Sequence, residues 1–242
     1  MRVTPLRAEP LAQPGVAVFA RAPVAGYAKT RLIGRLGATG AAALQHRLTA
    51  RAIGTARAAA LGPVSLWCAP DRGHPAFAAF ARECGVALHD QPGGDLGTRM
   101  LHAFRALTAE RPLLLIGTDC PALEVRHLRA CATALHDGAD AVFLAAEDGG
   151  YVLVGMARPL PALFAGVAWG SAQVMQQTRR RAAGCRLAIA EPAVLWDIDG
   201  PADYDRAIAD GVLPADARGD NPPAACQDAA SAPDRPPPCA SC

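Results

Sequence analysis

Short apolar runs alternate with longer stretches of helical periodicity over most of the chain, and this alternation restricts the fold more than any other property of the sequence. Strands that alternate with helices of roughly ten to fifteen residues are typical of βαβ units and a mainly parallel sheet. The sequence therefore predicts an α/β fold. The expected strands are 15–20, 62–68, 86–90, 112–116, 139–145, 151–156 and 186–190, and the expected helices are 39–60, 75–83, 97–110, 124–136, 171–183 and 201–209.

The pattern stops near the C-terminus. Val212 and Leu213 are the last large apolar residues, no aromatic residue follows Tyr204, and Pro, Ala, Asp and Ser dominate the remainder of the 242 residues. Such a segment buries too little apolar surface to offset the entropy of ordering it. We predict a flexible leader over 1–13, one domain over 14–212 and a disordered Pro/Ala-rich tail over 213–242. The tail ends in a CxxC pair, Cys239 and Cys242, with Cys226 upstream; these thiols could bind a soft metal, form a redox pair or have no function.

Composition excludes some classes of protein. The 24 basic and 22 acidic residues leave a formal net charge of +2, and no long basic stripe favours a nucleic-acid partner. No apolar run approaches the roughly 18 residues that a membrane span requires, and the N-terminus lacks the apolar core of a signal peptide. We expect a cytoplasmic protein without a membrane partner.

The cysteines outside the tail have no paired spacing and are expected to be reduced thiols: Cys68, Cys84, Cys120, Cys131 and Cys185.

A basic loop follows the first expected strand. It contains Arg21, Gly26, Lys29 and Arg31, so three cations lie near one turn that a glycine can bend sharply. Open α/β sheets bind ligands at the carboxyl ends of their strands, where this loop begins. The loop could cradle a di- or triphosphate, or it could be an ordinary solvated loop. It has neither the Walker A run nor GxGxxG.

Asp119 directly follows the apolar strand at 112–116. A carboxylate at this position could hold Mg²⁺ against phosphate oxygens. Alternatively, it could cap the following helix. The neighbouring Cys120 is interpreted as a structural thiol, because no histidine lies near it in the sequence.

Asp148, Gly149 and Gly150 lie between two expected strands. Asp-Gly-Gly is an ordinary hairpin signal, but two glycines could also let the backbone approach a ligand while Asp148 binds a sugar hydroxyl or a metal-bound water. Further along, Trp169 could line an acceptor pocket or fill the core, and Ser171 is a plausible helix N-cap.

Two aspartates, Asp197 and Asp199, precede the last expected helix. If the segment is extended, residues two apart share one side, so either carboxylate could reach a metal held by Asp119. Asp203 is expected in the first turn of the helix, where the dipole favours an anion.

The order of these segments resembles a known family. The blocks resemble the radical-SAM/selenodomain-associated transferase family, often labelled arsenosugar-biosynthesis glycosyltransferases, within the nucleotide-diphospho-sugar transferase (GT-A) superfamily. The resemblance covers about residues 15 to 210. It implies a Rossmann-like three-layer sandwich and a Mg²⁺- or Mn²⁺-dependent glycosyltransferase with a nucleotide-diphospho-sugar donor and a small-molecule acceptor. The blocks are FARAPVAGYAKTRL, GGDLGTRM, GTDCPAL, EDGGYVLVG, VAWGSAQV and WDIDGPADY.

The same blocks are similar to those of nucleotidyltransferases that include the 2-phospholactate guanylyltransferase of deazaflavin-cofactor synthesis. This similarity implies that Lys29 and Arg31 bind a triphosphate and that Asp119 binds Mg²⁺. Many GT-A enzymes have Asp-x-Asp, whereas here a single Asp stands between Thr and Cys. The second metal ligand is therefore expected at Asp199 rather than Asp148. The alternative function is transfer of a nucleotide from an NTP to a small phosphorylated acceptor.

The resemblance also suggests roles for the remaining positions. Catalysis would be electrostatic, with a bound cation and basic side chains neutralising the leaving group. Asp95 could contact base, ribose or acceptor, or could only cap a helix, and Arg99 could meet a phosphate. A third possibility is a nucleotide-binding protein without turnover. We expect a monomer or homodimer. The predicted site comprises catalytic Lys29, Arg31, Asp119 and Asp148; nucleotide-binding Arg21, Gly26, Lys29, Arg31, Asp95 and Arg99; acceptor-binding Gly149, Gly150, Tyr151, Trp169 and Ser171; and metal-binding Asp119 and Asp199.

Overall fold

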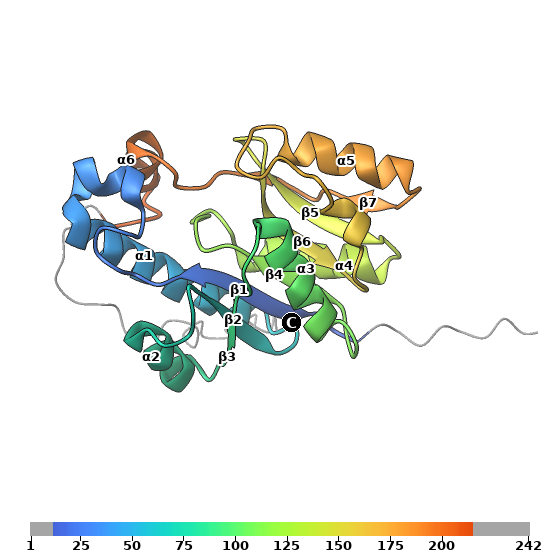
Figure 1. The fold of residues 1–242 in the computed structure, drawn as a ribbon, viewed down its shortest axis with the longest axis horizontal. Helices are drawn as coiled ribbons and strands as arrows, with labels where there is room; N and C mark the ends of the chain where they lie inside the picture. The colour runs from blue at the N-terminus through green and yellow to red at the C-terminus, as the bar shows by residue number, and fades with distance from the viewer. Residues whose placement is uncertain (1–11, 215–242) are drawn as a thin grey trace, which may run out of the picture.

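The first strand, β1 (Gly15–Arg21), is a continuous apolar run that is buried up to its last residue. In a computed structural model, which describes residues 12–214, this strand lies in the middle of a central sheet (Figure 1). It pairs in parallel with β2 (Val64–Ala69) and β4 (Leu113–Ile116), and β2 pairs in parallel with β3 (Ala87–Asp90). Near-continuous apolar strands are typical of parallel sheets that are covered on both faces.

The other half of the sheet is mixed. β6 (Tyr151–Met156) runs antiparallel to β4 and to β5 (Ala141–Ala146), while β7 (Ile189–Ala190) and β8 (Val194–Leu195) pair in parallel with β5. The strand order is β3-β2-β1-β4-β6-β5-β7, with β8 also paired to β5. The hairpin predicted at Asp-Gly-Gly is thus present between β5 and β6. The α/β class with a mainly parallel sheet is confirmed.

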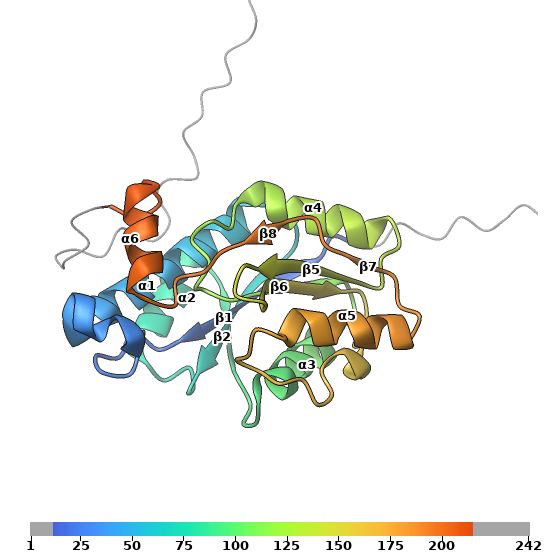
Figure 2. The same ribbon diagram turned by 90° about the horizontal axis from the view of Figure 1, so that it is seen from above.

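Helices cover both faces of the sheet, which gives three layers (Figure 2). α1 (Ile33–Ala58), α2 (Pro75–Cys84) and α4 (Val125–His136) pack on one face through residues such as Ile53, Phe77 and Leu128. α3 (Leu96–Leu107) and α5 (Val174–Gly184) cover the other face, where Phe104 and Met175 are buried.

The last helix, α6 (Pro201–Ala209), packs away from the sheet against α1. Tyr204 and Ala207 of α6 are buried in one cluster with Leu44 and Leu48 of α1. Leu213 joins the same cluster. No helix among residues 12–214 has the length and apolarity needed to cross a bilayer.

Several predicted boundaries are wrong. The long helix begins at Ile33 rather than 39, because two helical stretches merge across a kink at Gly37, whose φ is 72°. The strand predicted over 186–190 is only two residues long, Ile189–Ala190. Arg186, the first residue of the predicted strand, has a left-handed backbone conformation (φ 55°), which a strand does not contain. Ser171 is not the N-cap of α5, which begins at Val174 after Gln173. The sequence pattern did not predict β8 or the two short 3-10 helices, Thr30–Leu32 and Pro161–Leu163.

Candidate functional site

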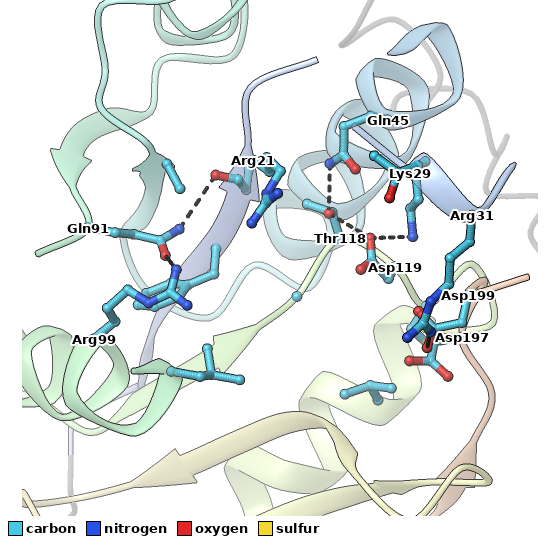
Figure 3. Close-up of a pocket in the computed structure, with 18 of the residues that line it drawn as sticks. Arg21, Lys29, Arg31, Gln45, Gln91, Arg99, Thr118, Asp119, Asp197 and Asp199 are labelled. Carbon is cyan, nitrogen blue, oxygen red and sulfur yellow. Dashed lines mark hydrogen bonds and ion pairs between the residues drawn. The ribbon is translucent and has the colours of Figure 1, made fainter. Parts of the chain in front are cut away.

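A cleft of about 640 Å³ opens at the carboxyl ends of β1, β2, β3 and β4 (Figure 3). This is the edge at which open α/β sheets bind their ligands. The loop after β1, the starts of α3 and β6, and the segment before α6 complete its walls. Its polar lining residues are Arg21, Tyr27, Lys29, Thr30, Arg31, Gln45, Gln91, Arg99, Thr118, Asp119, Tyr151, Asp197 and Asp199.

Lys29 fastens the loop after β1 to two distant segments. Its Nζ lies 2.8 Å from Asp119 Oδ1 and donates a hydrogen bond of 2.6 Å to the carbonyl oxygen of Ile198. Only 8% of its side chain is exposed, whereas 46% of the Asp119 side chain is. Lys29 is therefore a buried cation whose charge is already compensated.

A chain of side-chain hydrogen bonds also holds Asp119, through the same oxygen that Lys29 contacts. Thr118 Oγ1 lies 3.2 Å from Asp119 Oδ1, and Gln45 Nε2 donates to Thr118 Oγ1 at 3.0 Å. Gln45 and Thr118 are both buried. Asp119 does not cap α4, because Glu124 is the N-cap of that helix. The helix-capping role considered for Asp119 is therefore wrong, and its carboxylate faces the cleft (Figure 3).

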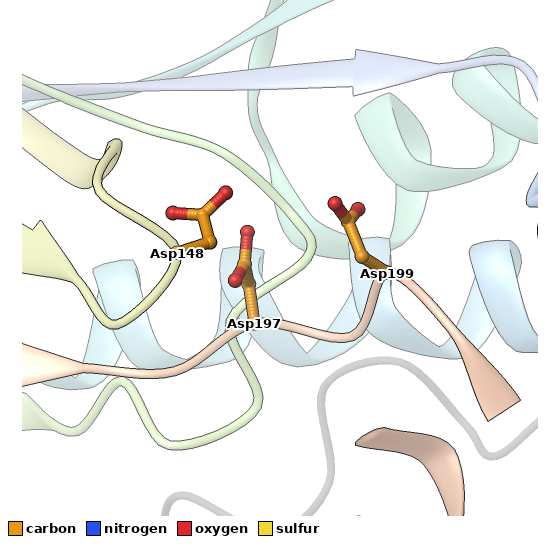
Figure 4. A group of neighbouring side chains, drawn as sticks. All are labelled: Asp148, Asp197 and Asp199. Atoms are coloured by element: carbon orange, nitrogen blue, oxygen red, sulfur yellow. The ribbon is translucent and has the colours of Figure 1, made fainter. Parts of the chain in front are cut away.

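Asp148, Asp197 and Asp199 form an acidic triad, in which one ligand oxygen of each residue lies within 4.8 Å of the others (Figure 4). Burial, and to a lesser extent the negative charges of Asp148, Asp199 and Asp119, raise the pKa of Asp197 to about 6. Carboxylate oxygens are the ligands that hard divalent cations prefer, and a cation would relieve this repulsion. The donor set therefore fits Mg²⁺ or Mn²⁺.

The triad differs from the predicted metal pair of Asp119 and Asp199. Asp199 belongs to it, but Asp119 contacts Lys29, and Asp148 and Asp197 take part instead. Asp197 was predicted only as an alternative to Asp199. Its spacing of two residues from Asp199 was the available signal, but only the β5–β6 hairpin brings Asp148 to the same place.

Helix α6 fixes the two segments that carry the triad. Arg206 makes a two-pronged salt bridge to Glu147, at 2.8 and 3.3 Å, and lies 4.4 Å from the ring centre of Trp196. Asp203 Oδ2 accepts hydrogen bonds from the backbone N–H groups of Asp199 and Gly200, at 3.1 and 2.7 Å. The predicted placement of Asp203 in the first turn is confirmed.

The arginines that line the cleft differ in their partners. Arg31 lies 3.0 Å from Asp199, and both side chains are at least half exposed. Arg99 donates to Gln91 Oε1 at 3.2 Å, and Arg21 has no salt bridge within residues 12–214. Gln91 was not predicted, because it belongs to no motif.

Most of the predicted acceptor residues do not line the cleft; among them only Tyr151 does. Gly149, with φ 92°, faces the backbone of Ala172, and Trp169 packs against Gly97. Ser171 closes a local turn, donating to the carbonyl oxygen of Ala168 at 2.7 Å. These positions serve the packing of the loop before α5.

Two predicted nucleotide-binding residues also have local roles. Asp95 is the N-cap of α3, where its Oδ1 accepts from the Thr98 N–H at 2.7 Å, and these hydrogen bonds lower its pKa. Gly26, with φ 84°, shapes the loop after β1 but is not among the lining residues. Burial raises the pKa of the Cys120 thiol to about 12, so the structural interpretation of this cysteine is supported. Cys226, Cys239 and Cys242 lie outside the described residues.

Replacing Lys29 with methionine is expected to destabilise the fold. The change leaves the Asp119 carboxylate and the Ile198 carbonyl without their cation, which should lower the free energy of unfolding by about 2 kcal/mol, below the loss typical of a fully buried pair because Asp119 is half exposed. Urea denaturation measures the change. Arg31→Met is the matched control, because it removes an exposed ion pair. Equal stability of the two variants would contradict a structural role for Lys29.

Comparisons with known proteins give one family and several structural neighbours. A family model described as "Uncharacterized protein conserved in bacteria (DUF2064)" matches residues 50–171. A solved protein from Desulfovibrio desulfuricans G20, provisionally named a nucleotide-diphospho-sugar transferase, is 27% identical with a TM-score of 0.70, over 78% of this chain and 84% of that chain. No curated protein matches the sequence.

Two more distant structures share the fold. CMP:2-keto-3-deoxy-manno-octonic acid synthetase complexed with CTP is 13% identical with a TM-score of 0.53, over 84% of this chain and 100% of that chain. The 4-diphosphocytidyl-2C-methyl-D-erythritolsynthase from Anaerococcus prevotii DSM 20548 is 10% identical with a TM-score of 0.55, over 83% and 99%. The fold is thus one that nucleotide-sugar transferases and nucleotidyltransferases share.

Proposed function

The chain belongs to the bacterial family described as "Uncharacterized protein conserved in bacteria (DUF2064)", and from this premise we propose that it is a divalent-cation-dependent glycosyltransferase. Its donor would be a nucleotide-diphospho-sugar, and its acceptor a small molecule. The observation that carries the proposal is the acidic triad of Asp148, Asp197 and Asp199, of which Asp197 and Asp199 line a cleft that basic side chains also line. The Desulfovibrio neighbour supports the donor class.

The three aspartates would hold Mg²⁺ or Mn²⁺, which supplies charge neutralisation for the departing diphosphate. Asp119 lies near enough to raise the pKa of Asp197, and its role as a further ligand remains a prediction. Lys29 holds Asp119 and the segment at Ile198 together, so it orients the site rather than offering a free charge.

Arg31 forms an exposed ion pair with Asp199. Its guanidinium can turn from that carboxylate to a phosphate oxygen, because both partners are exposed and an exposed ion pair is weak. Tyr151 lines the cleft beyond β4 and is the acceptor-side residue of the proposal. These groups act by position and charge, and no covalent intermediate is required.

A second candidate is nucleotidyl transfer from an NTP to a small phosphorylated acceptor. Arg21 and Arg99 favour it, because both line the cleft without a salt bridge to any residue in 12–214. A triphosphate offers more negative charge for such groups than a diphosphate-sugar does. A protein that binds nucleotides without turnover is the third possibility.

A thermal-shift panel distinguishes these functions. The purified chain is heated with NTPs, NDPs and NDP-sugars, with and without Mg²⁺. Ligand binding raises the unfolding midpoint by mass action, so we expect stabilisation by one NDP and its sugar conjugate only when Mg²⁺ is present.

Asp197→Asn serves as the control that should lose the Mg²⁺-dependent part of the shift. Stabilisation chiefly by one NTP would replace the proposal with nucleotidyl transfer. A shift that survives in Asp197→Asn would contradict the assigned cation site, and no shift with any nucleotide would contradict both transferase functions.

A further inference from the structure

We infer that Arg99, oriented by Gln91 and joined by Arg21, forms a subsite for an anionic group of the substrate, a phosphate or a carboxylate. The subsite lies at the β1–β3 side of the cleft, away from Asp197 and Asp199 of the acidic triad (Figure 3). The inference rests on the proposed function only in that the cleft is where the substrate binds.

Gln91 is a buried side chain in a fixed orientation. It is only 8% exposed, and its Nε2 donates to the carbonyl oxygen of Trp67 at 2.9 Å and, more weakly, to that of Ala20 at 3.5 Å. These carbonyls stand near the ends of β2 and β1. Because its amide nitrogen faces two acceptors, the amide oxygen must point the other way.

The amide oxygen of Gln91 accepts a hydrogen bond from Arg99. The Arg99 NH1 group donates to Gln91 Oε1 at 3.2 Å, and Arg99 Nε lies 3.4 Å from the carbonyl oxygen of Asp95. Both acceptors are neutral. The guanidinium is half-buried, forms no salt bridge within residues 12–214, and keeps further N–H groups for a ligand. The Asp95 carboxylate is near enough to feel the charge of Arg99, but it is occupied by the N–H of Thr98.

The other cations of the cleft are already paired. Lys29 contacts Asp119 and Arg31 contacts Asp199. In Figure 3, Arg21 lies between the Gln91–Arg99 pair and the residues around Asp119. Of the four basic residues predicted to bind the nucleotide, Arg99 and Arg21 therefore carry the positive charge that no salt bridge within residues 12–214 compensates, whereas Lys29 and Arg31 are paired.

A guanidinium held in one orientation, in a cleft that a second arginine also lines, can bind an oxyanion, because its N–H groups match the spacing of phosphate or carboxylate oxygens. A neutral hydroxyl would leave both charges uncompensated. We therefore assign to the substrate an anionic group that binds here, in addition to any group that meets the cation site.

The test is calorimetric titration of the full chain with inorganic pyrophosphate and, separately, with malonate, in the presence of EDTA and at low salt. We expect the wild type to bind at least one anion and Arg99→Ala to raise its Kd about tenfold or more, as loss of a charge-assisted pair predicts. Gln91→Ala should raise Kd less, because it removes the orientation but not the charge. Arg105→Ala is the matched control, since it removes an exposed arginine of the same helix that does not line the cleft.

Tighter binding of pyrophosphate identifies a phosphate subsite, and tighter binding of malonate identifies a carboxylate subsite. Equal Kd values for Arg99→Ala and Arg105→Ala, or no anion bound by the wild type, would overturn the inference. If Arg99→Ala unfolds, Arg99→Lys gives the same comparison, because a lysine keeps the charge but not the planar fork. The titration contains neither nucleotide nor cation, so its outcome is independent of the thermal-shift panel.

Discussion

Asp197→Asn is expected to stabilise the cation-free protein and at the same time to abolish its divalent-cation binding. Burial and three neighbouring carboxylates raise the pKa of Asp197 from 3.8 to about 6. A group whose pKa is higher in the folded state contributes stability below its unfolded pKa and loses that contribution as pH rises through its folded pKa. The wild type should therefore lose stability between about pH 4 and pH 6 through this residue, and Asp197→Asn should lack that decline. We expect the free energy of unfolding of Asp197→Asn to exceed that of the wild type by an amount on the order of 1 kcal/mol at neutral pH. This figure is lower than the full pKa shift would give, because Asp197 is partly exposed to solvent.

The same variant should lose the cation. Electron paramagnetic resonance of free Mn²⁺ measures binding directly, and the transfer rate with Mg²⁺ should fall on the order of 100-fold or more, as loss of an electrostatic stabiliser predicts. In the wild type, cation affinity should weaken below about pH 6, where Asp197 holds a proton.

Asp199→Asn and Asp119→Asn complete the series. Asp199→Asn should also lose Mn²⁺, since Asp199 belongs to the triad. If Asp119→Asn loses as much affinity as Asp197→Asn, Asp119 is a further ligand, and its Oδ2 could serve while Oδ1 keeps its contact with Lys29. Wild-type affinity in Asp197→Asn would show that the triad is not the site.

Gly149→Ala should be among the most destabilising single changes in the domain. A Cβ at Gly149 would collide with the backbone carbonyl of Ala172, and backbone cannot turn aside as a side chain can. Gly149 also has a φ of 92°, a backbone conformation that is unfavourable for residues other than glycine. Strain and overpacking together predict a loss of about 4 kcal/mol in the free energy of unfolding, measured by urea denaturation.

Gly26→Ala separates the two causes. Gly26 has a similar φ of 84°, but a Cβ there would meet no atom within 4 Å. It should therefore show the backbone cost alone, about 1 kcal/mol. Equal losses of unfolding free energy for the two variants would mean that the loop before α5 moves to accommodate the new Cβ at little cost. Gly149 would then not fix the position of that loop.

The sequence predicted the elements well because each central strand is an uninterrupted apolar run and each helix carries its own periodicity. The hairpin between β5 and β6 could likewise be read from Asp-Gly-Gly, which is a local signal. Strand β8 could not, because Val194–Leu195 is a short edge strand whose pairing to β5 depends on the finished sheet.

The candidate site was only partly predictable for a related reason. Position after a strand located Lys29 and Asp119 at the cleft, but it could not reveal that they neutralise each other. Gln91 resembles any polar residue after a strand, and only the carbonyls of neighbouring strands give its amide a direction. Trp169 and Gly149 form suggestive motifs, yet their contacts are with Gly97 and Ala172, which sequence proximity does not indicate.

The hydrogen bond from Lys29 to Ile198 spans 169 positions of the chain. A contact of such separation forms only after the intervening strands and helices have lowered the entropy of closing so long a loop. Two of the three triad aspartates, Asp197 and Asp199, lie in the same late segment. The acidic triad is therefore complete only after this segment has packed against the rest of the domain. During synthesis, a ribosome-bound chain that ends before Asp197 would contain all four basic residues of the cleft but only one of the three triad aspartates, Asp148.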